Sequence, residues 1–187
     1  MKNIFTVGVF AVLLSIPLAG ASAEGVGSVV GVETGYGYVF SSQGLNPQTP
    51  HAPLTSLYYG YLILDRPNTS ALLSIVLGYN WFPTAAGGNA LHALVYGVEY
   101  EHTFFRGNWV ALAVDYGLLF NLILVDGRQS YAFGNHTRLG LGPVFNISDR
   151  DQLLVNISYN MMDFPYFELA SASLSYGSLA VRYQRRL

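Results

Sequence analysis

The chain has 187 residues, of which 51% are hydrophobic and only 11% are charged, and it contains no cysteine. A secreted soluble domain with so few charges would aggregate or would need disulfides, so the composition argues against that class. The formal net charge of −2 provides no basic surface, and we expect no nucleic-acid partner.

The N-terminus has the three parts of an export signal. Lys2 supplies a positive charge, residues 4–18 form an apolar stretch, and Ala21-Ser22-Ala23 is an A-x-A cleavage site. We therefore expect residues 1–23 to be a cleaved signal peptide and residues 24–187 to form one domain. The alternative is a single anchoring helix, but the apolar stretch is shorter than the ~20 residues that such a helix needs.

Beyond residue 23, every apolar stretch is interrupted by Gly, Asn, Asp or Glu, so no further membrane helix is predicted. Large apolar residues instead alternate with small or polar ones, which is the pattern of β-strands. In residues 26–40, for example, Val32 and Tyr36 alternate with Glu33 and Gly35. An exported apolar chain without membrane helices can satisfy its backbone in lipid by forming a closed barrel.

Turn signals divide the mature chain into predicted strands. We expect eight of them, at residues 26–40, 55–64, 70–82, 91–104, 109–122, 136–147, 152–161 and 173–187. Long connections alternate with short turns, as in outer-membrane barrels with long outer loops and short periplasmic turns. The predicted fold is therefore all-β, an eight-stranded antiparallel up-and-down transmembrane β-barrel with both chain ends in the periplasm. A barrel of about eight strands is just wide enough for side chains to fill, so no continuous aqueous pore is expected.

A soluble eight-stranded barrel with an apolar interior is the alternative fold. The aromatic residues favour the membrane barrel, because they gather near predicted strand ends, where a membrane barrel has interfacial girdles. These aromatic residues are Tyr38, Phe40, Tyr79, Trp81, Phe82, Phe104, Phe105, Trp109 and Tyr183.

If the apolar parity faces lipid, the charged residues of the strands face the lumen. They are Glu33, Glu99, Glu101, Asp115, Arg138 and Arg182. Counting from the periplasmic strand ends places Arg138 nearer the outer mouth than Arg182. Buried carboxylates are costly unless paired, and arginine is well shaped to bridge several of them. We expect a salt-bridge plug organised around Arg182 rather than a catalytic carboxylate pair, with Leu72, Val76 and Leu154 as the only substantial apolar side chains inside.

The histidines show no metal-binding spacing. His51, His92 and His136 lie in or beside predicted outward connections, and His102 lies near the periplasmic rim. We interpret them as scattered surface residues and expect no metal and no cofactor. The sequence also contains no G-x-S-x-G, no P-loop and no dinucleotide-binding glycine motif.

The last predicted strand carries a pattern similar to the C-terminal assembly signal of outer-membrane barrels. Leu179, Val181, Tyr183 and Leu187 share one parity, although Leu187 replaces the usual terminal aromatic and Arg185 replaces an apolar residue. The resemblance implies recognition by the barrel-assembly machinery. The whole mature chain thus resembles small eight-stranded outer-membrane proteins of the OmpX, OmpW and opacity-protein type, which implies a place in the bacterial outer membrane among lipids that include lipopolysaccharide.

This resemblance leaves three functions open. The first is a structural or surface-interaction protein whose outer loops meet an extracellular or host ligand. The second is a narrow conduit for small hydrophobic molecules, as the OmpW-like resemblance implies. The third is an enzyme that acts on lipid A. The charged lumen favours the first, because a conduit for apolar molecules needs an apolar inner wall.

The enzyme alternative has one local resemblance. Lipid A deacylases of the PagL type carry a His-x-Ser motif and a later Glu, and Asn156-Ile157-Ser158 with Glu168 is similar in position. Asn156 stands where the histidine would be, and a serine without an imidazole base is barely activated. Ser158 also faces the lumen by parity. The lipid A palmitoyltransferase barrel begins with an amphipathic helix, whereas Glu24 here leads almost directly into a strand, so we expect no enzyme.

Overall fold

The computed structural model describes residues 27–43, 51–83, 90–106, 109–125, 131–167 and 170–187, so the predicted signal peptide lies outside the described residues. The described ranges hold eight strands: β1 (Ser28–Gln43), β2 (His51–Arg66), β3 (Thr69–Pro83), β4 (Ala90–Phe104), β5 (Val110–Val125), β6 (Tyr131–Asn146), β7 (Asp151–Phe167) and β8 (Ala170–Arg186). Within these ranges no helix is long and apolar enough to cross a membrane.

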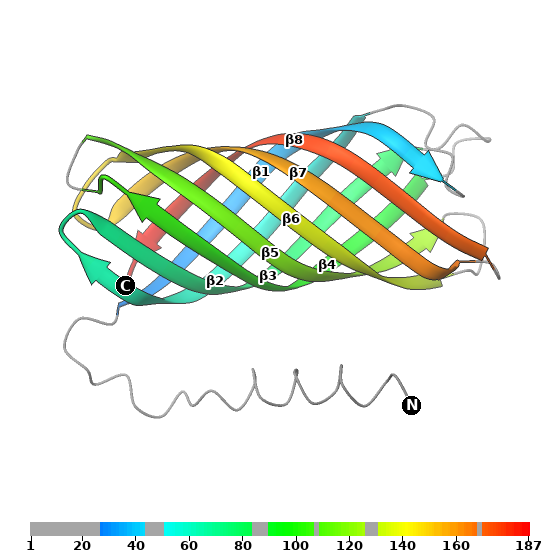
Figure 1. Ribbon diagram of the computed structural model, residues 1–187, viewed down its shortest axis with the longest axis horizontal. Helices are drawn as coiled ribbons and strands as arrows, with labels where there is room; N and C mark the ends of the chain where they lie inside the picture. Colours follow the sequence, from blue (N-terminus) through cyan, green and yellow to red (C-terminus); the bar gives the residue numbers. More distant parts are fainter. Residues whose placement is uncertain (1–26, 44–50, 84–89, 107–108, 126–130, 168–169) are drawn as a thin grey trace, which may run out of the picture.

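The strands close into one antiparallel barrel (Figure 1). Each strand pairs with its neighbours in sequence, and β1 pairs with β8 to complete the cylinder. The predicted eight-stranded antiparallel barrel is therefore confirmed. The start of β1 and the end of β8 lie at the same end of the cylinder in Figure 1, and we call it the periplasmic end.

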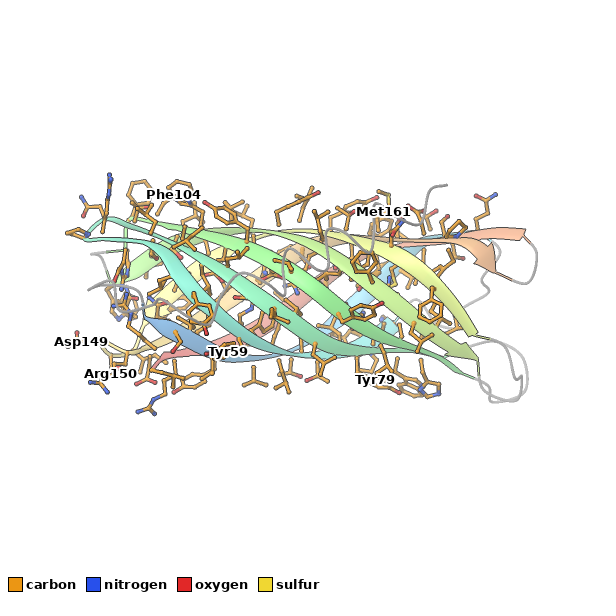
Figure 2. The ribbon with its side chains drawn as sticks, turned by 90° about the horizontal axis from the view of Figure 1, so that it is seen from below. Tyr59, Tyr79, Phe104, Asp149, Arg150 and Met161 are labelled. Carbon is orange, nitrogen blue, oxygen red and sulfur yellow. The ribbon has the colours of Figure 1, made fainter. Side chains whose placement is uncertain are left out.

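The exterior of the barrel is apolar, and alternation places the small and polar residues inside. Leu57 and Ile157 are 59% and 67% exposed, whereas Glu33 is completely buried. Tyr59 and Tyr79 lie on the outer surface (Figure 2). An apolar exterior is what lipid requires and is the reverse of a soluble barrel, so the soluble alternative is wrong.

One predicted girdle aromatic is misplaced. The other eight are exposed, but Phe82 is completely buried and packs edge-on against Tyr176, with ring centroids 5.6 Å apart. The parity of β3 explains the error, because Tyr79 and Trp81 face outward and the next residue must face inward.

The strands also extend further towards the outer end than predicted. β2 begins at His51 and β7 runs to Phe167, so parts of two predicted loops are strand. Pro53 falls in the connection predicted before residue 55, yet it pairs with Tyr36 of β1. The ladder between β2 and β3 begins only at Leu54. The missing N–H of Pro53 therefore interrupts no pairing with β3.

Apolar side chains, some of them from these extensions, fill the outer half of the lumen, and we call them the outer apolar cluster. Its most deeply buried large members are Phe82, Ile123, Met162, Phe164, Leu174 and Tyr176. The expectation that Leu72, Val76 and Leu154 are the only substantial apolar residues inside is therefore wrong. Met162 and Phe164 fall in a predicted connection and Phe82 in a predicted girdle, whereas Leu174 and Tyr176 share the inward parity of Arg182 in the last predicted strand and were overlooked.

Candidate functional site

The structure brings all six charged residues predicted for the lumen into one cluster, which we call the lumen charge network. Each comes from the inward parity of its strand, and none is more than 5% exposed. The members are Glu33 of β1, Glu99 and Glu101 of β4, Asp115 of β5, Arg138 of β6 and Arg182 of β8.

Arg182 contacts three carboxylates. Its Nη1 donates to Glu101 Oε2 at 3.0 Å, its Nη2 lies 2.6 Å from Glu99 Oε1, and its Nε donates to Glu33 Oε2 at 3.0 Å. The guanidinium carbon also lies 3.8 Å from the centre of the Tyr58 ring. Such a cation over an aromatic face is attracted by the quadrupole of the ring. Arg182 thus connects β1, β4 and β8 through the lumen.

Arg138 is the second centre of the network. Its backbone pairs with Asn160 of β7, but its side chain extends to Glu33, which it binds bidentately at 2.7 and 2.9 Å. Its Nε lies 3.4 Å from Asp115 Oδ1. Glu33 is therefore shared by both arginines. The planar guanidinium is suited to this bridging.

Four acidic residues face two arginines, and neutral donors add hydrogen bonds to three of the carboxylates. Gln184 Nε2 donates to Glu101 at 2.8 Å, and Asn156 Nδ2 donates to Asp115 at 2.5 Å. The Tyr58 hydroxyl donates to Glu33 at 3.2 Å. Sequence reasoning missed these three donors. All three lie on the inward-facing parity of their predicted strands, which was the signal that the sequence offered.

A chain of amide and hydroxyl groups lies beside the network. His136 Nε2 contacts Asn160 Oδ1 at 3.0 Å, and Asn160 Nδ2 donates to Ser158 Oγ at 3.0 Å. The Ser158 and Ser178 hydroxyls are 2.6 Å apart. His136 is only 3% exposed, so its interpretation as a surface residue is wrong. The reason is that β6 begins at Tyr131, which places His136 inside the strand on the inward parity.

These contacts bear on the hydrolase resemblance. Ser158 faces the lumen and is 4% exposed, and Asn156 donates to Asp115 instead of Ser158. His136 contacts Asn160 and not the serine. Glu168 lies outside the described residues. The described residues therefore give Ser158 no imidazole partner that could accept its proton.

The other three histidines lie on the outside of the barrel. The His51 ring packs 5.3 Å from Tyr36, and His92 Nδ1 contacts the Tyr79 hydroxyl. His102 contacts the Tyr100 hydroxyl at 2.8 Å. In the part of the chain that the structure describes, no three His, Cys, Asp or Glu residues are grouped as metal ligands.

The residues of the predicted assembly signal lie on the lipid-facing side of β8. Leu179, Val181, Tyr183 and Leu187 are each at least 36% exposed. Their strand closes the barrel against β1. A small cavity of about 30 Å³ lies at the periplasmic end, with Glu101 and Gln184 in its wall.

Comparison with known proteins identifies the fold. No protein-family model matches the chain, and no curated protein sequence matches it. The crystal structure of Neisserial surface protein A is similar, with 15% identity, a TM-score of 0.67 and coverage of 88% of this chain and 100% of that one. The outer membrane enzyme PagL is also similar, with 12% identity, a TM-score of 0.54 and coverage of 85% and 99%. The chain thus has the fold of small eight-stranded outer-membrane barrels, and its apolar exterior suits that membrane.

Proposed function

We propose that this chain is a non-enzymatic outer-membrane barrel with a closed lumen, which acts as a structural and surface-interaction protein through its outer connections. The observation that supports this best is the lumen charge network, in which two arginines bind four carboxylates from opposite sides of the barrel. An ion or solute crossing the lumen would have to separate these buried pairs.

The energy of that separation supports closure. Breaking a buried pair so that one charge is left alone costs about 3–5 kcal/mol. The cavity at the periplasmic end holds about 30 Å³ and is bounded by Glu101, a member of the network. That volume accommodates only one or two water molecules. Beyond the network, the outer apolar cluster fills the lumen with side chains such as Phe82 and Tyr176.

A conduit for small hydrophobic molecules is the second candidate, and the outer apolar cluster favours it. A hydrophobic molecule could displace Phe164 or Met162 at the outer end. It would then meet Arg138 and Glu33, whose desolvated charges offer it no favourable contact. Lipid A hydrolysis has no such support, because Asn156 occupies the position of the base and contacts Asp115.

The partners follow from this proposal. Outer-membrane lipids, including lipopolysaccharide, surround the barrel, and an extracellular or host ligand meets the outer connections. The barrel-assembly machinery recognises β8 through Leu179, Val181, Tyr183 and Leu187.

Electrical recording tests the closed lumen. We expect the wild-type protein in planar lipid bilayers to show no conductance steps, whereas Arg182→Ala and Arg138→Ala combined with Phe82→Ala, which remove side chains from both the network and the outer apolar cluster, should produce them. A matched triple variant, Arg66→Ala and Arg185→Ala with Phe40→Ala, removes the same residue types outside the lumen and should remain silent. Stable conductance of the wild type would contradict closure. Accumulation of a hydrophobic dye in proteoliposomes that depends on the barrel would favour the conduit.

Cell-surface binding tests the interaction role. We would replace residues 44–50 and, separately, residues 126–130 by Gly-Ser segments of equal length. Both variants should still migrate as folded barrels on gels, and at least one should lose adherence of expressing cells to host cells. Unchanged adherence in both variants and in a strain lacking the protein would contradict this role. Lipid A from expressing cells should keep all its acyl chains in mass spectra.

A further inference from the structure

The arginines of this protein are distributed unevenly along the barrel. Among the described residues, two belong to the lumen charge network and the other five lie at the periplasmic end. The five are Arg66, Arg106, Arg150, Arg185 and Arg186. Only three aspartates accompany them there, namely Asp65, Asp149 and Asp151. This rim therefore carries an excess of positive charge.

Two of these arginines are already paired. Arg106 and Arg186 both form ion pairs with Asp65. Arg66 and Arg150 have no ion-pair partner among the described residues, and Arg185 has one ion-pair contact, of 3.9 Å, with Asp151. Three guanidinium groups at the rim thus keep donors for another partner, and two of them, those of Arg150 and Arg185, belong to adjacent segments of the chain.

Asp151 is the carboxylate beside these two arginines, and each of its oxygens already accepts one hydrogen bond. The Tyr183 hydroxyl donates to Oδ1 at 2.5 Å, and the Ser148 hydroxyl donates to Oδ2 at 2.7 Å. These hydrogen bonds hold the carboxylate at the turn between β6 and β7. One carboxylate, already bonded to two hydroxyl groups, therefore faces the two guanidinium groups of Arg150 and Arg185.

The two arginines are neighbours in the folded barrel. The backbone N–H of Arg186 donates to the Arg150 carbonyl at 2.8 Å, and Asp151 pairs with Arg185 in the β7–β8 ladder. Figure 2 shows Arg150 at the end of the barrel, beside Asp149. The side chain of Arg185 is 54% exposed. The two arginines are therefore adjacent along the rim, where Arg150 also borders the cavity at that end.

The surroundings of this pair are those of a membrane interface. Arg185 shares the lipid-facing parity of β8 with Tyr183 and Val181, which are 36% and 40% exposed. Ile147, beside the same turn, is 62% exposed. An apolar wall therefore continues from the two arginines towards the centre of the membrane. A ligand with a phosphate head and acyl chains fits this arrangement better than a free ion.

We propose that Arg150 and Arg185 bind the phosphate of an anionic phospholipid in the periplasmic leaflet, with its acyl chains against Tyr183 and Val181. Guanidinium groups match phosphate oxygens bidentately. A juxtamembrane arginine contributes about 1 kcal/mol to binding an anionic membrane, which corresponds to about fivefold in affinity. Loss of both arginines should weaken binding about thirtyfold. This site is independent of lumen closure and of the outer connections.

Native mass spectrometry of the folded barrel in neutral detergent tests this site with phosphatidylglycerol as the probe. The wild type should retain phosphatidylglycerol in preference to phosphatidylcholine, and Arg150→Gln with Arg185→Gln should lose about thirtyfold in affinity. The matched control is Arg66→Gln with Arg106→Gln, which removes the same charge at the same rim and should keep the binding. Lysine at both sites keeps the charge but loses the bidentate geometry, so it should preserve only part of the binding.

Three outcomes would overturn the proposal. The first is equal retention of phosphatidylcholine, because the site would then not select charge. The second is an equal loss in the Arg66 and Arg106 control, because binding would then reflect the total rim charge. The third is complete displacement of phosphatidylglycerol by an equal concentration of inorganic phosphate, which would identify a site for a free ion. Heat-modified gel migration verifies that each variant is folded.

Discussion

Replacing Arg182 by methionine is the sharpest test of how the lumen is held together. Methionine has a similar length but no charge, so the variant removes the cation and leaves most of the volume filled. Arg182 is 1% exposed and contacts Glu33, Glu99 and Glu101 at 2.6 to 3.0 Å. Its loss leaves buried carboxylates without their main partner.

The size of the effect follows from which carboxylates keep another cation. Glu33 retains its bidentate contact with Arg138. Glu99 retains only a contact of 3.8 Å with Arg138, and Glu101 retains the neutral donors Gln184 and Thr103. Removing one partner from a buried ion pair costs about 3–5 kcal/mol. We expect a loss of about that size in the free energy of unfolding.

Urea unfolding of the barrel in lipid vesicles, followed by gel migration of the folded and unfolded forms, measures this loss. Arg185→Met is the matched control, because it removes an exposed arginine from the same strand and should change stability by about 0.5 kcal/mol or less. Adding Glu99→Gln and Glu101→Gln to Arg182→Met removes the unpaired charges and should restore part of the stability. An Arg182→Met variant as stable as the control would refute the reasoning.

Three further measurements address other parts of the barrel. At Gly142 a Cβ would lie 1.8 Å from a backbone carbonyl of β7, whereas at Gly177 its nearest contact is 3.6 Å. In urea unfolding, Gly142→Ala should therefore lower the free energy of unfolding by about 1–3 kcal/mol. Gly177→Ala should change it little. Phe82→Ala should cost about 3–5 kcal/mol through the cavity it leaves, and bilayer recordings should still show no conductance because the lumen charge network remains. Phe40→Ala, on the lipid-facing side, should cost less in the same unfolding assay, and an equal cost would contradict the inward position of Phe82.

The sequence alone was sufficient to predict the barrel because alternation is a local signal. Glu33 and Asp115 fall on the parity opposite to the large apolar residues, so their inward direction follows from the period of two. The sequence did not reveal which of the charged lumen side chains would contact each other. The contact between Arg138 and Glu33 joins residues 105 positions apart, and it depends on barrel closure and side-chain reach.

Much of the outer apolar cluster was not predicted, because backbone pairing between strands decides where a loop begins. Residues that locally favour a turn, such as proline and glycine, do not decide it alone. Residues 162–172 are predicted to be a connection, yet β7 continues to Phe167 with a register shift after Phe164. Pairing with β8 overrides the local preference, and it places Met162 and Phe164 inside. His136 was misjudged for the same reason. Because these strands were predicted too short, residues that face the lumen were assigned to loops.

The position of the lumen charge network has a consequence for barrel closure. Glu33 and Arg182 are direct partners in the β1–β8 ladder, the pairing that joins the two ends of the chain. If β8 slipped by one residue, Arg182 would lose its place opposite Glu33, and a slipped strand that kept its backbone pairing would turn its side chains to the other face. An arginine facing lipid costs about 2–4 kcal/mol at the membrane midplane and less towards the interface. The buried pair therefore favours one register at the seam, whatever it contributes to net stability.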